Sequence, residues 1–109
     1  MSEKTYNGWK NYETWAVKLW MDNEESTYRH WRDESRRLAR KALDRDEFLA
    51  SLADALKDAH NDEAPELDGV WADLLGAALS EVDWHEVAES FVEDVQECWQ
   101  TEEDETEDA

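Results

Sequence analysis

The sequence predicts an all-α protein: a single compact domain of about five helices with a disordered acidic C-terminal tail. Only three glycines and one proline interrupt the 109 residues. Apolar side chains recur at helical spacing, and no stretch alternates apolar with polar residues for long enough to form a strand. A chain of this length has room for one core, so we expect residues 1–99 to form the helical domain and residues 100–109 the tail.

Two helices are predicted in the N-terminal half. The first runs from about Tyr12 to Asp22, with Asn11 as its N-cap. Its expected buried face consists of Tyr12, Trp15, Ala16, Leu19 and Trp20. The second helix is capped by Asn23 or Ser26 and extends to about Leu43. Its expected buried face consists of Tyr28, Trp31, Leu38, Ala39, Ala42 and Leu43.

Three further helices are predicted in the C-terminal half. A capping box of Asp44 and Glu47 begins the third, which ends near His60 and buries an apolar face of Phe48, Leu49, Leu52, Ala53, Leu56 and Ala59. After a loop over residues 61–69, the fourth helix is expected to bury Val70, Trp71, Leu74, Leu75, Ala78 and Leu79. A second capping box, Asp83 with Glu86, begins the last helix, whose inward face comprises Trp84, Val87, Ala88, Phe91, Val92, Val95 and Trp99.

Charge divides the chain into two parts. Residues 1–45 carry ten Lys and Arg against eight Asp and Glu, whereas residues 46–109 carry Lys57 alone against 22 acids. Six of the ten residues from 100 to 109 are acidic, which is typical of a solvated tail. Because a surface of one sign selects what can approach it, this asymmetry indicates a partner of opposite charge.

Several kinds of chemistry are not expected. Cys98 is the single cysteine, so it cannot form an intrachain disulfide, and acids beside it favour an inert, partly buried thiol. A polar N-terminus and the lack of an 18-residue apolar run predict a cytoplasmic protein without membrane contact. No glycine-rich phosphate loop is present. We therefore expect no enzyme activity, no cofactor and no metal site.

The stretch His85-Glu86-Val87-Ala88-Glu89 resembles the start of a zinc-protease motif, but Glu89 replaces the second histidine. A small metal-dependent hydrolase that uses His85 and nearby carboxylates is the enzyme alternative. The simpler interpretation is a polar residue near a helix start.

Two stretches resemble an uncharacterised family of small proteins from phages, plasmids and bacterial genomes. The first is Trp9-Lys10-Asn11-Tyr12-Glu13-Thr14-Trp15, continuing through residues 19–23, and the second covers residues 72–88. The resemblance implies a helical domain and a mobile-element setting, and it implies no reaction. In composition alone, the chain is similar to the acidic, helical DNA mimics that inhibit restriction enzymes.

The Asn-Tyr-Glu-Thr-Trp motif has two interpretations. In the structural one, Asn11 caps the helix, Thr14 lies in its first turn, and Trp9 packs against Trp15 across the helix start, much as a hydrophobic staple does. In the functional one, Asn11, Tyr12 and Glu13 form a recognition patch.

Seven basic residues follow the second predicted helix: Arg29, Arg32, Arg36, Arg37, Arg40, Lys41 and Arg45. The simplest interpretation is that they pair with the acidic half of the chain and reduce its self-repulsion. Contact with a partner protein is an alternative. Direct nucleic-acid binding is not expected, because the acid excess repels phosphate.

The acidic surface is the remaining candidate site. On the last helix Glu86, Glu89, Glu93, Asp94 and Glu97 lie largely opposite the apolar face and span about 16 Å. Asp54 and Asp58 of the third helix supply further charge. Duplex DNA presents roughly nine or ten phosphates over that length, so the helix carries about half their density.

These residues predict a non-enzymatic interaction protein that imitates nucleic acid. We expect it to occupy the DNA- or RNA-binding groove of a basic host protein, such as a restriction or CRISPR-type nuclease or a transcription factor. The alternative is an accessory or assembly protein of a mobile element that docks through Tyr6, Trp9 and Trp20, with its acidity serving solubility or salt adaptation.

Overall fold

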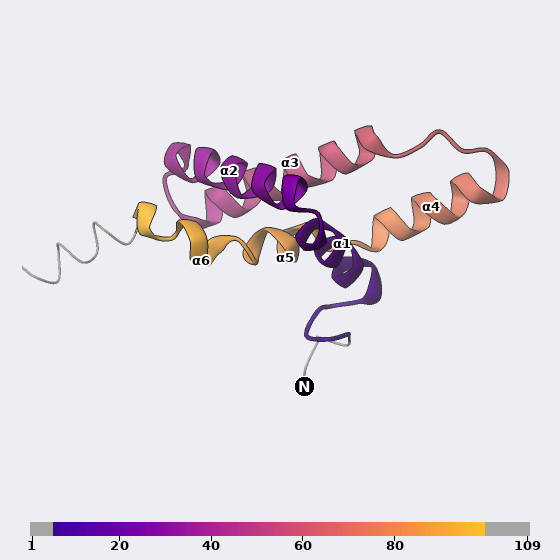
Figure 1. Ribbon diagram of the computed structural model, residues 1–109, viewed down its shortest axis with the longest axis horizontal. Helices are drawn as coiled ribbons and strands as arrows, with labels where there is room; N and C mark the ends of the chain where they lie inside the picture. Colours follow the sequence, from indigo (N-terminus) through magenta and orange to yellow (C-terminus); the bar gives the residue numbers. More distant parts are fainter. Residues whose placement is uncertain (1–5, 100–109) are drawn as a thin grey trace, which may run out of the picture.

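The computed structural model describes residues 6–99, which fold into helices joined by short connections (Figure 1). In chain order these are α1 (Tyr12–Asn23), α2 (Glu25–Lys41), α3 (Arg45–Glu63), α4 (Gly69–Glu81), α5 (Trp84–Glu89) and α6 (Val92–Val95). Between residues 6 and 99 no strand is present, and an isolated bridge joins Tyr6 to Trp9. The all-α fold class is confirmed, while the predicted tail at 100–109 lies outside the described residues.

Side-chain caps begin three of the helices, as the sequence predicts. Oδ1 of Asn11 accepts a hydrogen bond from the Thr14 amide at 2.9 Å at the start of α1. Asp44 does the same for the Glu47 amide at 2.9 Å, and Asp83 for the Glu86 amide at 3.1 Å. Each cap satisfies an amide that the helix itself leaves without a partner. Helix α2 differs, because its N-cap is Glu24 instead of Asn23 or Ser26.

Helix α3 is the centre of the core. It packs most extensively against α5 and also contacts α2. Its buried side chains are Phe48, Leu49, Leu52 and Leu56. From the C-terminal segment they meet Trp84, Val87, Ala88, Phe91, Val92 and Val95. Both sets agree with the predicted inward faces.

The predicted C-terminal helix is interrupted at Ser90 and Phe91, and again at Gln96. The Ser90 amide donates to the Val87 carbonyl, and the Phe91 amide to the Ala88 carbonyl, so the turn is tighter than an α-helix. Oγ of Ser90 also donates to the Val87 carbonyl at 2.6 Å. Such side-chain hydrogen bonds compete with the backbone hydrogen bonds of an α-helix. The acids beyond this point therefore do not continue the line of α5.

The predicted buried face of α1 is wrong at two positions. Trp20 is 66% exposed and Tyr12 is also exposed, whereas Thr14 and Met21 are buried. The helix turns Thr14, Val17 and Met21 toward the core, because the Thr14 hydroxyl finds hydrogen-bond partners there. In α2, Leu43 is 87% exposed because the helix ends at Lys41 and leaves it in the connection to α3.

Helix α4 departs furthest from expectation. It was predicted to be a core helix, yet none of its residues is buried, and Val70, Trp71 and Leu74 are exposed. In Figure 1, α4 extends beyond the other helices at one end of the molecule, whose extents are 62 × 34 × 23 Å. It contacts α1, and Leu79 near its C-terminal end packs against the core. The N-terminal part of the apolar stripe, with Val70, Trp71 and Leu74, is therefore not part of the core.

Candidate functional site

The acids of the predicted binding surface are distributed over two faces. Asp54 and Asp58 are exposed, one turn apart, on the side of α3 opposite its buried residues. Glu89, Glu93, Asp94 and Glu97 are exposed on the segment from α5 to residue 97, and these four are called the acidic segment below. Because the core lies between α3 and this segment, the two groups do not share one surface.

Glu86 does not belong to the exposed surface. Its side chain is buried, and Oε1 accepts a hydrogen bond from the Lys10 amide at 3.0 Å. The prediction that it contributes to a phosphate-like face is wrong. The capping box places Glu86 in the first turn of α5, where the chain before α1 crosses over it.

Four of the exposed acids form no ion pair with the described part of the basic half. Within residues 6–99, Asp54, Asp58, Glu93 and Asp94 form no ion pair within 4.0 Å. Glu89 Oε2 lies 4.0 Å from His85 Nδ1, a pair that attracts only when the imidazole is protonated. The negative potential of these groups is therefore available to a partner.

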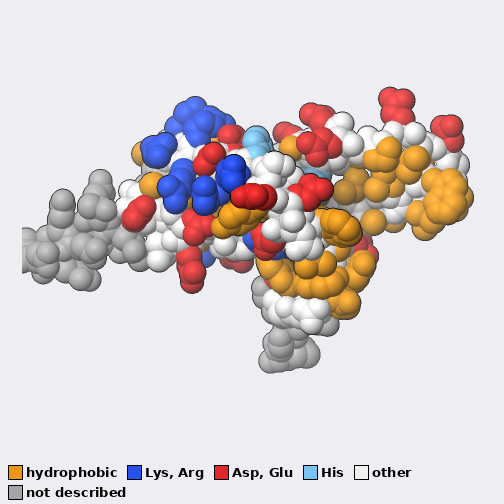
Figure 2. Space-filling model, in the orientation of Figure 1, with side chains coloured by type: hydrophobic (Ala, Val, Ile, Leu, Met, Phe, Trp, Pro, Cys, Tyr) orange, Lys and Arg blue, Asp and Glu red, His pale blue; other side chains and the backbone are white. Residues whose placement is uncertain are grey.

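The basic residues of α2 pair within their own helix. Arg29 pairs with Glu25, and Arg37 pairs with Glu34. The hydrogen bond from Arg37 holds the pKa of Glu34 below its usual value. For Arg36, Arg40 and Lys41, no acid of the described chain lies within 4.0 Å. Figure 2 shows Lys and Arg gathered over α2, with hydrophobic side chains gathered over α4 at the opposite end.

Asn11 and Thr14 of the Asn-Tyr-Glu-Thr-Trp motif form a hydrogen-bond network that joins the start of α1 to the connection between α4 and α5. The Thr14 hydroxyl donates to Asn11 Oδ1 at 2.6 Å and accepts from the Asp83 amide at 2.9 Å. Nδ2 of Asn11 donates to the Glu81 carbonyl at 2.7 Å. These contacts agree with the structural interpretation of Asn11 and Thr14.

The aromatic residues of the motif pack in a different pairing from the predicted one. The Trp15 ring lies 5.0 Å from that of Tyr6 and 5.5 Å from that of Tyr12, between centroids. Tyr6 reaches Trp15 because Asn7 and Gly8, both with positive φ, turn the chain between Tyr6 and Trp9. Tyr6, rather than Trp9, thus covers the start of α1.

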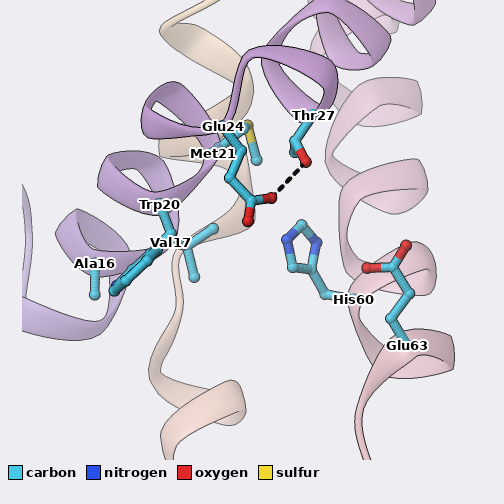
Figure 3. Close-up of a pocket in the computed structure, with 8 residues that line it drawn as sticks. All are labelled: Ala16, Val17, Trp20, Met21, Glu24, Thr27, His60 and Glu63. Carbon is cyan, nitrogen blue, oxygen red and sulfur yellow. Dashed lines mark hydrogen bonds between the residues drawn. The ribbon is translucent and has the colours of Figure 1, made fainter.

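An open pocket of about 330 Å³ lies between α1, the start of α2 and the end of α3 (Figure 3). His60 projects into it from α3, while Glu24 accepts a hydrogen bond from Thr27 at 2.9 Å on the opposite wall. Nδ1 of His60 lies 2.8 Å from the Leu56 carbonyl. Its ring stacks on Trp31 at 6.3 Å and lies 5.0 Å from Trp84.

Sequence reasoning missed this role of His60. The only available signal was its position one turn after Leu56 on the buried side of the helix. Aromatic packing and the bond to a backbone carbonyl fix the imidazole, which is the arrangement of a structural histidine.

The remaining candidates from the sequence are a metal site, the thiol of Cys98 and a membrane-spanning helix. Within residues 6–99, no cluster of three or more His, Cys, Asp or Glu side chains could hold a metal ion. Cys98 is exposed, contrary to the expectation of a partly buried thiol. No helix in this part of the chain is both long and apolar enough to cross a membrane.

Comparison with known proteins places the chain in a family. A family model described as a family of unknown function (DUF7249) matches residues 2–105. No curated protein and no solved structure matches the chain.

Proposed function

The chain belongs to the DUF7249 family of unknown function, and from its surface charge we propose that it is a non-enzymatic protein whose acidic segment binds a basic, nucleic-acid-binding protein. The segment would occupy the groove that normally holds DNA or RNA. A mobile element would use such a protein against a host defence nuclease or a transcription factor.

One observation carries this proposal: within residues 6–99, no ion pair within 4.0 Å joins an arginine of α2 to Glu93 or Asp94, although α2 and α6 are in contact. A protein that used its acids only to balance its own basic residues would pair them between these two neighbouring helices. Here Arg29 and Arg37 of α2 pair locally, with Glu25 and Glu34. Glu93 and Asp94 stay exposed in α6. Rows of exposed charge of one sign mainly increase association rates and select partners of the opposite sign.

A matched pair of triple variants tests the proposal. In the first, Glu89→Gln, Glu93→Gln and Glu97→Gln remove three charges from the acidic segment. In the control, Asp54→Asn, Asp58→Asn and Asp62→Asn remove three charges from exposed positions of α3. Both exchanges keep helix propensity nearly constant, since each pair of residue types ranks close together.

The measurement is capture of basic proteins from a bacterial lysate, followed by association kinetics with the captured protein and competition by a duplex oligonucleotide. We expect the first variant to bind at least tenfold more weakly, chiefly through slower association, and the control to bind like the wild type. Duplex DNA should displace this chain from the captured protein. Simultaneous binding of the captured protein to DNA and to this chain, or equal effects of both variants, would contradict mimicry.

The second candidate function is docking through N-terminal aromatic residues, in an assembly or accessory role. The exposure of Tyr6 and Trp20 favours it. Trp20→Ala should then abolish capture of the partner, whereas the variant with Gln at positions 89, 93 and 97 should still capture it.

A further inference from the structure

The open pocket between α1, the start of α2 and the end of α3, called the His60 pocket below, has one apolar wall and one wall of hydrogen-bond acceptors (Figure 3). Side chains of α1 form the apolar wall: Ala16, Val17, Trp20 and Met21. The acceptors belong to Glu24, His60 and Glu63. Trp20 is 66% exposed, so its ring is accessible to a ligand. These two walls suit a ligand that is flat, partly apolar and rich in hydrogen-bond donors.

The imidazole of His60 presents an acceptor to the pocket. Its Nδ1 lies 2.8 Å from the Leu56 carbonyl, and a carbonyl oxygen can only accept, so Nδ1 carries the proton of the neutral ring. Nε2 is then the acceptor. Figure 3 shows that the ring nitrogen on the side of α1 faces the pocket. Among residues 6–99, no group donates a hydrogen bond to this nitrogen.

The two carboxylates of the pocket have no cation beside them in the described part of the chain. Neither Glu24 nor Glu63 forms an ion pair within 4.0 Å there, and no Lys or Arg of residues 6–99 lines the pocket. The Thr27 hydroxyl orients Glu24 through a hydrogen bond of 2.9 Å. A cationic ligand supplies the missing charge. An anion is repelled, and a purely apolar ligand leaves the acceptors without partners.

Arginine fits these walls better than lysine does. The guanidinium group is planar, stacks on aromatic rings and carries five N–H donors. One of its faces can lie on the Trp20 ring while its edges donate to the carboxylates and to Nε2 of His60. The ammonium group of lysine is compact and strongly hydrated, so it gains less from a flat aromatic wall.

The shape of the site favours an arginine within a peptide over the free amino acid. The pocket of about 330 Å³ is at the lower end of the range of about 300–1,000 Å³ for ligand sites, which suits one side chain. A second hollow of about 240 Å³ adjoins it, shares Thr27, His60 and Glu63, and continues beside His30 and Trp31. The hollow has room for a residue next to the arginine. Free arginine also carries a carboxylate, which a chain of net charge −19 repels.

We propose that the His60 pocket binds an arginine side chain of a basic partner protein, with the guanidinium group stacked on Trp20. The N–H groups donate to the carboxylates of Glu24 and Glu63 and to Nε2 of His60. This inference rests on the proposed function for the class of partner, and it adds a contact that is separate from the acidic segment. The acidic segment attracts basic proteins by charge, whereas the pocket selects an arginine.

Short blocked peptides test the proposal without a partner protein. The probe is acetyl-Gly-Arg-Gly-amide, titrated into the ¹⁵N-labelled full chain in about 100 mM NaCl, where a Debye length of about 10 Å screens charges outside the pocket. Nuclear magnetic resonance follows the indole N–H signals. We expect millimolar binding that shifts the signal of Trp20 and leaves that of Trp71, which is equally exposed, in place.

Two further peptides test the chemistry of the ligand. With lysine in place of arginine, binding should be at least about threefold weaker, because the stacked planar group is lost. With citrulline, which has the shape of arginine without its charge, binding should be at least about tenfold weaker, because the charge-assisted hydrogen bonds are lost.

A matched pair of double variants locates the site. Glu24→Gln with Glu63→Gln should weaken binding of the arginine peptide at least about fivefold, since each exposed ion pair contributes up to about fivefold. The control, Asp58→Asn with Asp62→Asn, removes the same charge from exposed positions of α3 that do not line the pocket. It should change the affinity by less than about twofold.

A second pair tests the aromatic wall. Trp20→Ala should weaken binding about threefold, as expected for an exposed cation–π contact. Trp71→Ala is the control, since that tryptophan is also 66% exposed but lies on α4, and it should bind like the wild type. Circular dichroism checks that each variant is folded.

Three outcomes overturn the proposal. They are a wild type that does not bind the arginine peptide at concentrations up to about 20 mM, equal binding of the lysine and arginine peptides, and equal losses in the two double variants. The variant with Gln at positions 89, 93 and 97 should bind the peptide like the wild type. Failure of the acidic segment to bind a host protein is thereby distinguished from failure of the pocket.

Discussion

At the residue scale, Thr14 shows how a polar side chain can be buried at little cost. Its hydroxyl serves as a donor to Asn11 and an acceptor for the Asp83 amide, so both roles of the group are used. A buried polar group with satisfied hydrogen bonds is tolerated, whereas an unsatisfied one destabilises the fold. The motif thus connects two parts of the chain that are 69 residues apart.

Thr14→Val keeps the shape of the side chain and removes these hydrogen bonds. The Asp83 amide then loses its partner, and we expect the free energy of unfolding to fall by about 1–3 kcal/mol. Urea denaturation followed by circular dichroism measures it. Thr27→Val, which removes a hydrogen bond to the exposed Glu24, is the control and should cost below about 0.5 kcal/mol. Equal losses would show that the Thr14 network contributes nothing specific.

At the scale of the element, periodicity predicted helices better than it predicted burial. The stripes of α4 and of the α5–α6 segment are alike in sequence, yet the second is buried and the first has no fully buried residue. Spacing shows that a helix has an apolar face, but what covers that face depends on where the chain turns. Over residues 61–69 no pattern specifies that direction.

The same limit applies to the candidate site. Caps at Asn11, Asp44 and Asp83 could be predicted because their hydrogen bonds are local, between residues three apart. The burial of Glu86 could not be predicted, since the Lys10 amide that bonds to it is 76 residues away. Nor did spacing indicate that Asp54 and the acidic segment would occupy different faces.

Two tryptophan substitutions test the division between core and exposed stripe. Trp84 is buried at the start of α5, so Trp84→Ala should lower the free energy of unfolding by about 3–5 kcal/mol. Trp71→Ala should change it by less than about 0.5 kcal/mol. Denaturant titration gives both values. If the two variants lost similar stability, α4 would have to pack against the body in solution.

At the scale of the whole molecule, basic and apolar side chains gather over different elements. Basic side chains cover α2, and the uncharged apolar stripe of α4 lies at the opposite end (Figure 2). The acidic segment lies at the same end as α2, which contacts α6 (Figure 1). This arrangement leaves the net charge of −19 largely uncompensated within the fold, which opposes the compact state through self-repulsion.

Salt should therefore stabilise the protein. Raising NaCl from about 20 mM to about 300 mM shortens the Debye length from about 20 Å to about 6 Å and weakens repulsion between the acids. We expect the melting temperature to rise, and to rise less in the variant with Gln at positions 89, 93 and 97. Thermal denaturation by circular dichroism measures both. A melting temperature that falls with salt would mean that the acids are held in ion pairs with the arginines of α2.

The packing of the C-terminal segment against α3, chiefly through α5, also orders events during synthesis. Leu49, Leu52 and Leu56 have no complete cover until Trp84, Val87 and Phe91 have been translated, because those residues form the other half of the core. Closing this contact spans more than thirty residues, so it is slower than forming any single helix. A nascent chain that stops after α4 exposes both the unfilled face of α3 and the stripe of α4, and is a substrate for chaperones or proteases.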